Sequence, residues 1–295
     1  MAKTNPEGQQ DPISPPTTKG GTPDLNIDSI KKRIKPIAEM AGPTSCLFYG
    51  RSGTGKTTLA GTFPKPSLLL DVSEKGTDSI ADIEGIEVLK VECWEDFEAI
   101  YWYLRSGKHP YKTVIVDTVT QLQKLAINYI LEQNGRDSSG PMNQNLWGQV
   151  AKLMSAWLTN YRDLEMHTVF LAQDRNSTED SRAGEDQIIP EIGPRLSPSV
   201  AASVNAAVKI IGQTYIKEFV KATKDGQVKT YSFRLRIGPH SVYLTKVRKA
   251  KGIALPNSIH DPSFEKLMKA ISPQPQTQPE NPPETDQPQN TQAPK

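Results

Sequence analysis

Cysteine and long apolar segments are scarce in this sequence. Only Cys46 and Cys93 occur among 295 residues. Two cysteines exclude a disulfide-rich scaffold and a zinc site built from several cysteines. No apolar run approaches the about 18 residues of a membrane-spanning helix, and no apolar signal segment follows the polar N-terminus. We therefore expect no membrane partner and a location in the reducing cytoplasm.

Aromatic residues are missing from both ends of the chain. Residues 1–24 and 272–295 contain 12 of the 24 prolines and no Phe, Trp or Tyr. Such segments bury too little apolar surface to offset the entropy lost on ordering the chain. We predict a disordered tail at 1–24, one folded domain at 25–271, and a disordered Pro/Gln-rich tail at 272–295.

Short apolar runs alternate with helical patterns in the first part of this domain. Because both faces of the runs are apolar, they are typical of buried parallel strands. Alternating strands and helices predict an α/β fold with a mainly parallel sheet flanked by helices. The predicted strands are Ser45–Tyr49, Ser67–Val72, Ile86–Val91, Thr113–Asp117 and Thr168–Ala172, and the apolar stripes of the helices run over residues 94–104, 119–130 and 146–161.

The pattern changes to consecutive strands at about residue 207. An Asp-Gly pair at Asp225 and Gly226 is typical of a hairpin turn. We predict an antiparallel extension of the sheet over about residues 207–256, followed by a short helix at Pro262–Ile271. The strands expected in the extension are Val208–Gly212, Tyr215–Lys221, Val228–Ile237 and Val242–Val247.

One glycine-rich segment matches the phosphate-binding pattern G-x-x-x-x-G-K-[ST] at every position. Its glycines allow backbone N–H groups to point inward, and the following helix adds the positive end of its dipole. Lys56 would contact the β- and γ-phosphates of ATP, and the Thr57 hydroxyl would bind Mg²⁺. The predicted cofactor-binding residues are Gly50, Arg51, Ser52, Gly53, Thr54, Gly55, Lys56, Thr57 and Thr58.

Three further carboxylates lie at or near the ends of predicted strands. Asp117 ends an apolar strand, so its carboxylate would lie at the sheet edge that binds ligands in open α/β sheets and would hold Mg²⁺; an aspartate there can also simply cap a helix. Glu74 is our candidate for the catalytic base that activates water, and Asp71 is its rival. Alternatively, Glu74 is a solvated side chain beside Lys75.

The order of these elements resembles a RecA-type ATPase core. The resemblance rests on the segments Tyr111–Gln121 and His167–Arg175, which are separated by a long helical pattern. In that family, a glutamine that ends the strand after the Asp strand senses the γ-phosphate and opens a DNA-binding loop. Gln173 has this place, so the resemblance implies a RecA-like P-loop NTPase core in which Gln173 takes part in catalysis.

Two other segments extend the resemblance. Lys249–Pro256 is similar to a family segment whose lysines reach the nucleotide of the neighbouring subunit, which implies Lys249 and Lys251 as cofactor-binding residues in a ring or filament of identical subunits. The run Thr62–Pro66, followed by Leu68–Asp71, resembles phage-encoded nucleotide-binding proteins of the single-strand annealing (Sak-type) group. The location would then be the cytoplasm of the bacterial host.

The chain departs from the RecA pattern at two places. The family's catalytic glutamate lies two residues after the strand aspartate, where this chain has Ser73, with Glu74 one residue later. The loop after Gln173, residues 174–186, has a net charge of −3 and is poorly suited to bind phosphates. Ser73 in place of the expected carboxylate favours a second hypothesis, a nucleotide-gated binding or loader module with little hydrolysis.

The strongest positive charge lies in the predicted extension. Residues 217–251 contain ten Lys and Arg against Glu218 and Asp225, a net charge of +8, with Phe219, Tyr231, Phe233 and Tyr243 interleaved. Cations with aromatic rings suit single-stranded DNA or RNA, because stacking tolerates any base. The alternative is a charged strand edge that prevents aggregation. The polar loop 132–145 is a second candidate for DNA contact.

The leading hypothesis is an ATP-hydrolysing DNA recombination protein that acts with Mg²⁺ on single-stranded DNA by annealing or strand exchange. A single-strand-binding or other replication protein is a possible partner of the tails. A small-molecule kinase, with residues 246–251 as a phosphate lid, is a third hypothesis; it predicts phosphoryl transfer without stimulation by DNA.

Overall fold

The computed structural model describes residues 31, 34, 36, 42–73, 76–176, 192–223, 226–249 and 251–272. The chain divides into two units, residues 1–42 and 43–295. Only four residues of the first unit are described, so the fold below is that of the second. The predicted domain boundaries and tails stay predictions, because residues 1–24 and 273–295 lie outside the described residues.

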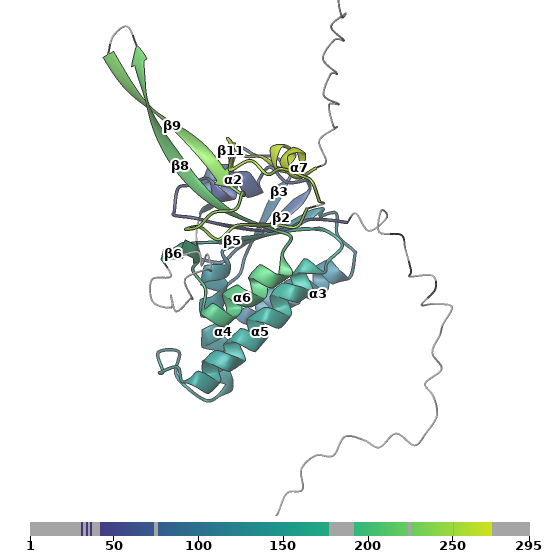
Figure 1. Ribbon diagram of the computed structural model, residues 1–295. Coiled ribbons are helices and arrows are strands. Elements are labelled where there is room, and N and C mark those ends of the chain that lie inside the picture. Colours follow the sequence, from purple (N-terminus) through teal and green to yellow (C-terminus); the bar gives the residue numbers. More distant parts are fainter. Residues whose placement is uncertain are drawn as a thin grey trace, which may run out of the picture. The chain divides into compact units, whose positions relative to one another are not determined.

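A nine-stranded sheet forms the centre of this unit, with helices on both of its faces (Figure 1). The strand order is β11-β9-β8-β1-β5-β4-β2-β3, and β10 pairs with β8. Strands β6 and β7 form a separate antiparallel pair. The strands are β1 (Ser45–Tyr49), β2 (Ser67–Asp71), β3 (Ile86–Lys90), β4 (Thr113–Asp117), β5 (His167–Ala172), β6 (Asp174–Asn176), β7 (Ile192–Pro194), β8 (Ile210–Thr223), β9 (Gly226–Arg236), β10 (Lys246–Val247) and β11 (Ser258–His260).

Strands β3, β2, β4, β5, β1 and the start of β8 run parallel, and β9, β10 and β11 add antiparallel pairs. The α/β fold with a mainly parallel sheet and an antiparallel C-terminal extension is therefore confirmed. The helical elements are α2 (Lys56–Ala60), the 3₁₀ turn η2 (Gly76–Ile80), α3 (Trp94–Arg105), α4 (Val119–Gln133), α5 (Gln144–Arg162), α6 (Pro198–Ala207) and α7 (Phe264–Ile271).

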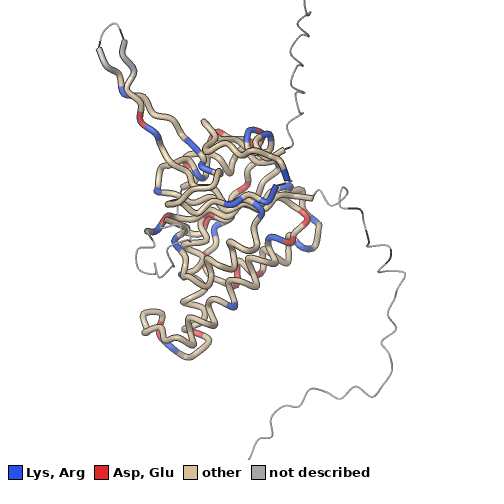
Figure 2. Tube along the Cα trace, in the orientation of Figure 1, with Lys and Arg blue, Asp and Glu red and all other residues tan. Residues whose placement is uncertain are grey.

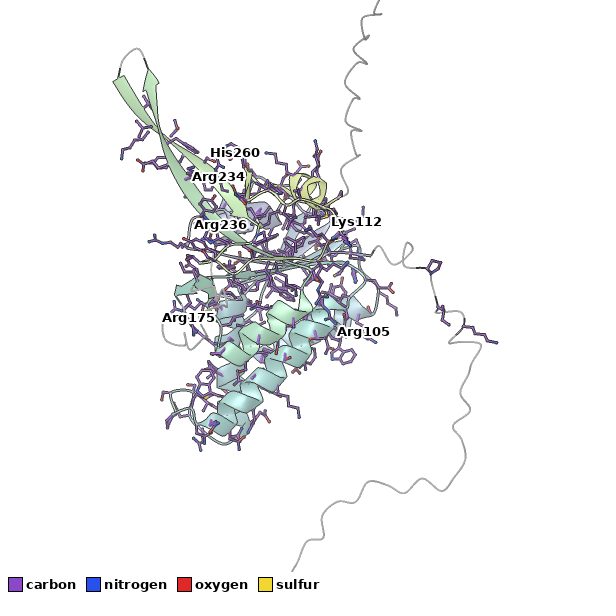
Figure 3. All side chains as sticks on the ribbon, viewed as in Figure 1. Arg105, Lys112, Arg175, Arg234, Arg236 and His260 are labelled. Carbon is purple, nitrogen blue, oxygen red and sulfur yellow. The ribbon has the colours of Figure 1, made fainter. Side chains whose placement is uncertain are left out.

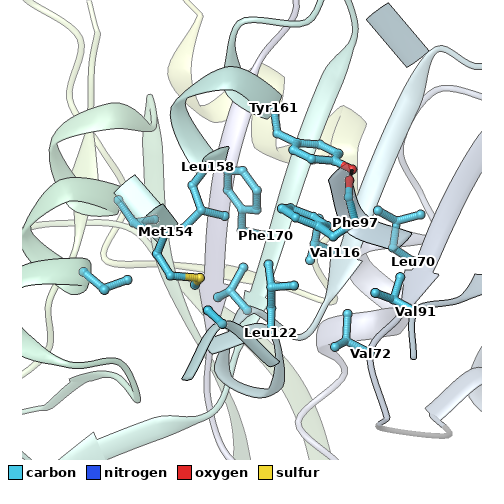
Figure 4. Packing of buried hydrophobic residues seen from close by; sticks show 14 of the residues in the cluster. Leu70, Val72, Val91, Phe97, Val116, Leu122, Met154, Leu158, Tyr161 and Phe170 are labelled. Atoms are coloured by element: carbon cyan, nitrogen blue, oxygen red, sulfur yellow. Dashed lines mark hydrogen bonds between the residues drawn. The ribbon is translucent and has the colours of Figure 1, made fainter. Parts of the chain in front are cut away.

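The buried residues form two clusters, one on each face of the sheet. Alternate residues of β1 divide between them: Leu47 and Tyr49 belong to the cluster with α3–α6, and Cys46 and Phe48 to the cluster with α2 and α7. In the first cluster, the rings of Phe97 and Tyr161 stack at 4.2 Å between centroids, and the Tyr161 hydroxyl donates to the Phe97 carbonyl (Figure 4). Burial on both faces explains why the central strands are apolar throughout.

Four details of the sequence-based prediction differ from the structure. The predicted break between Gly212 and Tyr215 does not exist, because β8 is one continuous strand of 14 residues. Only Lys246 and Val247 of the predicted strand Val242–Val247 are extended in the sheet as β10. Strand β3 lies at the sheet edge and is largely exposed rather than buried on both faces, and helix α6 was not predicted.

Candidate functional site

The parallel strands bring four sequence-distant segments to one edge of the sheet. In the register, Tyr49 lies opposite Ala172, Asp117 opposite Leu171, and Asp71 opposite Asp117. These are the last residues of their strands or the ones beside them. The loop after β1, the carboxylate of Asp117 and the segment that starts at Gln173 therefore meet at the carboxyl edge, which is the ligand-binding edge of open α/β sheets.

The loop Gly50–Gly55 has the backbone conformation that its glycines allow. Gly53 and Gly55 have φ angles of 79° and 81°, in the left-handed region that disfavours other residues. A Cβ atom on Gly50 would lie 2.4 Å from the backbone oxygen of Thr214 in β8. Gly50 therefore permits close packing of the loop against β8, which the sequence pattern alone does not reveal.

Lys56 lies over the loop that precedes it. Its buried ammonium group donates hydrogen bonds of 2.9 Å to the carbonyl oxygens of Gly50 and Arg51. Thr54 is held by hydrogen bonds to the Arg51 carbonyl at 2.8 Å and to the Thr214 hydroxyl at 2.7 Å. The structure thus places a cation and a helix N-terminus at the same point, as an anion-binding loop requires.

Thr57 and Asp117 meet although they are 60 residues apart. The Thr57 hydroxyl donates a 2.7 Å hydrogen bond to Oδ2 of Asp117. A hydroxyl and a carboxylate are hard oxygen ligands of the kind Mg²⁺ prefers, so this pair fits the cation. Both line a hollow of about 360 Å³ beside the loop, together with Ser52, Gly53, Gly55, Lys56, Thr58, Gly76, Ser79, Thr118 and Phe233.

The two candidates for the catalytic base differ in what the structure says of them. Glu74 lies outside the described residues. Asp71 is buried at the end of β2, directly opposite Asp117. Ser73, which stands where the RecA resemblance implies a glutamate, has a left-handed φ of 62°, which is unusual for a residue other than glycine. Gly76, two residues after Glu74, lines the hollow beside the phosphate loop.

Gln173 lies one residue beyond β5, between the Asp117 strand and the phosphate loop strand in the sheet order. Its backbone N–H donates to the Thr120 hydroxyl at 3.1 Å, and its carbonyl accepts from the Arg195 N–H at 2.7 Å. Its neighbours Asp174–Asn176 form β6, and most of the predicted acidic loop 174–186 lies outside the described residues.

Lys249 and Lys251 are not brought to the phosphate loop of their own chain. Strand β10 pairs with the start of β8 and runs toward the amino edge of the parallel strands, where the Arg248 N–H donates to the Lys209 carbonyl. Lys249 donates to the Ile253 carbonyl and is exposed, as is Lys251. Lys246 donates to the Asn205 carbonyl, and its burial lowers the pKa of the ammonium group.

Strands β8 and β9 form a hairpin that extends beyond the rest of the sheet (Figure 1). Strand β1 pairs only with Ile210–Gln213, and β11 only with Arg234–Arg236, so the hairpin residues beyond these pair with each other. Lys and Arg lie along the described part of the hairpin (Figure 2). Because successive strand residues point to opposite faces, the hairpin has two faces of different chemistry.

One hairpin face is cationic and aromatic. The Lys217 ammonium lies 5.1 Å, and the Arg234 guanidinium 5.4 Å, from the centre of the Phe219 ring. Among its described residues, the opposite face has mostly apolar, exposed side chains and an ion pair between Lys229 and Glu218 at 2.9 Å. The apolar side chains are Ile216, Val220, Tyr231 and Phe233.

A hollow of about 710 Å³ lies between the base of this hairpin and the phosphate loop. Arg51 and Thr54 line it from the loop, and Tyr215 and Tyr243 line it from the extension. The Arg236 guanidinium contacts both tyrosine rings, at 4.4 and 4.0 Å from their centres. Figure 3 labels Arg234 and Arg236 near the base of the hairpin and Arg175, another lining residue, below them.

The polar loop that is the second candidate for DNA contact lies elsewhere. Glu132 and Gln133 belong to α4, and Gln144 and Asn145 to α5, so the connection itself covers residues 134–143. Figure 1 draws it at the lower end of these helices and the β8–β9 hairpin at the upper end of the molecule.

The fold and the phosphate loop together define a P-loop ATPase-type domain. The chain matches the family described as AAA domain over residues 43–249, and it belongs to this family. It is also 27% identical to the SPbeta prophage-derived uncharacterized protein YorG of Bacillus subtilis (strain 168), over 149 residues. This similarity covers 46% of the chain and 45% of the relative's length. Membership of the family implies that the domain binds a nucleotide.

In the part of the chain that the structure describes, no helix is both long and apolar enough to cross a membrane.

Proposed function

We propose that this protein is an ATP-hydrolysing DNA recombination protein of phage type that acts on single-stranded DNA, by annealing or strand exchange. The observation that carries the proposal is the arrangement of the phosphate loop, with its Thr57–Asp117 pair, beside a hairpin with a cationic and aromatic face. The similarity to a prophage-derived protein supports the phage origin.

The nucleotide half of the proposal follows from the residues at the carboxyl edge. The loop N–H groups and Lys56 would bind the β- and γ-phosphates of ATP, and Thr57 with Asp117 would hold Mg²⁺. The bound Mg²⁺ would neutralise charge that develops on the phosphates during hydrolysis. Glu74, or its rival Asp71, would take a proton from the attacking water, and Gln173 would respond to the γ-phosphate.

The DNA half of the proposal follows from the hairpin and the hollow at its base. Tyr215, Phe219 and Tyr243 would stack on bases, while Lys217 and Arg234 would contact phosphates. Lys249 and Lys251 lie at the other edge of the sheet, where they would be available to the nucleotide of an adjacent subunit. ATP would then bind between subunits of a ring or filament, in the cytoplasm of the bacterial host.

The assignment to the Sak-type annealing group is part of this proposal and is supported by the Thr62–Asp71 segment and by the place of Gln173. A replication protein that binds the tails would be the corresponding partner. The second candidate is a nucleotide-gated loader with little hydrolysis. It is favoured by Ser73, which stands where the RecA pattern has a glutamate.

The ATPase rate with and without single-stranded DNA tests the proposal. We expect stimulation by DNA in the natural protein, no turnover in Lys56→Ala, and strongly reduced turnover in Glu74→Gln if Glu74 is the base. A Glu74→Gln rate equal to that of the natural protein would transfer the role to Asp71. A low rate that DNA does not change would contradict the recombination protein and favour the loader.

A further inference from the structure

Phe233 is the hairpin residue that lies against the phosphate loop. A Cβ atom placed on Gly55 would be 3.2 Å from Cδ1 of the Phe233 ring, so the ring packs against the loop backbone directly before Lys56. Phe233 is nevertheless 44% exposed. An exposed aromatic ring held at a phosphate-binding loop has a free surface on which another flat group can stack.

Phe233 lines two hollows. The hollow of about 360 Å³ contains the phosphate-binding groups described above. The other, of about 190 Å³, is lined by Gly55, Thr58, Leu59, Phe233, Asp261 and Pro262. It has room for roughly six water molecules, which is too little for a whole nucleotide but suits one flat ring system. Gly55, Thr58 and Phe233 line both hollows, so they adjoin at the start of α2.

Three separate elements hold the walls of the smaller hollow in place. The Asp261 N–H donates to the Phe233 carbonyl at 2.8 Å, which ties the segment after β11 to β9. The Phe264 N–H donates to the Thr62 hydroxyl at 2.8 Å, which ties the same segment to the turn that follows α2. Figure 3 labels His260, beside Asp261, close to Arg234, its partner in the β9–β11 pairing. The walls are therefore preformed.

We propose that this smaller hollow is the base subsite of the nucleotide site and that Phe233 is the residue on which a purine base stacks. The inference rests on the proposed nucleotide binding and deepens it. Pro262 provides an apolar wall, and the carboxylate of Asp261, paired with Nδ1 of His260 at 2.8 Å, provides a hydrogen-bond acceptor for an amino group of the base. Phosphates in the larger hollow and a base in the smaller one account for both hollows, which share Phe233 as a lining residue.

The test compares a ligand that has a base with one that lacks it. Binding of ATP, GTP, UTP and inorganic tripolyphosphate is measured by calorimetry on the full chain. For Phe233→Ala, we expect binding of ATP and GTP to weaken by about 10-fold or more, since alanine substitution removes one base–aromatic stack, while binding of tripolyphosphate stays the same. Phe233→Tyr should bind ATP like the natural protein.

The matched control is Tyr231→Ala, which removes an exposed aromatic ring from the same face of β9, two residues away from Phe233 and outside both hollows. It should leave all four affinities unchanged. Equal weakening of ATP and tripolyphosphate by Phe233→Ala would overturn the base subsite, because Phe233 would then only support the loop. No purine preference in the natural protein would also overturn it. Failure of the natural protein to bind either ATP or tripolyphosphate would instead reject the nucleotide-binding function itself, and the subsite with it.

Discussion

The carboxyl edge of the parallel strands and the β8–β9 hairpin belong to the same sheet but differ in how their side chains are held. At the edge, Lys56, Asp117 and Thr54 are buried, and Lys56 and Thr54 have hydrogen-bond partners on the loop or on β8. On the hairpin, Ile216, Val220 and Tyr231 are exposed, and Lys229 with Glu218 forms an ion pair at the surface.

This difference has consequences for the ligands that each region suits. Preformed N–H groups and a buried cation bind a small anion at fixed geometry, and their interactions are little screened by salt. Exposed cations and rings on a two-stranded ribbon bind a flexible polyanion, and this binding depends on salt. A two-stranded hairpin is marginal by itself. The close contact of Gly50 and Thr54 with Thr214 at its root therefore adds to the β1–β8 pairing that joins the two regions.

The largest expected effect separates the two regions completely. Lys56→Ala removes the cation at the phosphates, so ATP binding should weaken by about 100-fold or more, because hydrogen bonds to charged groups are the strong ones. Binding of single-stranded DNA without nucleotide should stay within about 2-fold, because the hairpin cations that would contact the DNA phosphates are unchanged. Calorimetry with ATP and fluorescence anisotropy with a labelled oligonucleotide measure the two. The control is Lys112→Ala, which removes an exposed lysine at the opposite edge of the sheet and should leave ATP binding unchanged. Unchanged ATP binding in Lys56→Ala would reject the assignment of the phosphate loop.

A second variant acts on the hairpin alone. The double substitution Lys217→Ala with Arg234→Gln should weaken binding of single-stranded DNA by about 10-fold, and lower the slope of log affinity against log salt by about 1.4, since each phosphate contact contributes about 0.7 on single strands. ATP affinity without DNA should not change. Anisotropy titrations at several salt concentrations give the slope.

The control for the hairpin variant is Lys229→Ala. Its ammonium group lies on the other face of the hairpin and pairs with Glu218. If Lys229→Ala lowers the slope as much as the double variant does, then the charge of the hairpin, and not its cationic and aromatic face, accounts for DNA binding. If neither variant changes the slope, DNA binds elsewhere, and the loop 134–143 becomes the next site to test.

The smallest expected effect concerns the junction of the two regions. Thr214→Val keeps the shape of the side chain but removes the hydroxyl that pairs with Thr54 at 2.7 Å and lies 3.3 Å from the Tyr49 carbonyl. We expect a loss of about 1 kcal/mol in the free energy of unfolding, or about 2–4 °C in Tm for a domain of this size. The Thr230 hydroxyl contacts the Phe219 carbonyl at 3.4 Å on the exposed hairpin. Thr230→Val should therefore lower the free energy of unfolding by less, as measured by calorimetric scans. Equal losses would show that the junction adds no stability of its own.

Much of the fold was predictable from local patterns. The central strands β1, β2, β4 and β5 match the predicted runs to within one residue at each end, because burial on both faces requires continuous apolar residues. The edge strand β3 was predicted to be buried on both faces, although it contains Glu87 and Lys90, and it is exposed. Its place at the edge follows from the strand order. The break predicted between Gly212 and Tyr215 was wrong for a similar reason. Gln213 and Thr214 are polar and interrupt the apolar pattern of β8, because they pack beside the phosphate loop.

The candidate site divides in the same way. The sequence by itself determined the phosphate loop, because this loop depends only on glycines, Lys56 and Thr57 at fixed spacing within eight consecutive residues. It also determined that Asp117 ends a strand. Only the tertiary structure decided that Thr214 and Phe233 lie against this loop and that the hairpin has one cationic and one apolar face. These contacts join residues about 160 to 180 positions apart and depend on sheet order and register, whereas a loop motif depends on its own backbone.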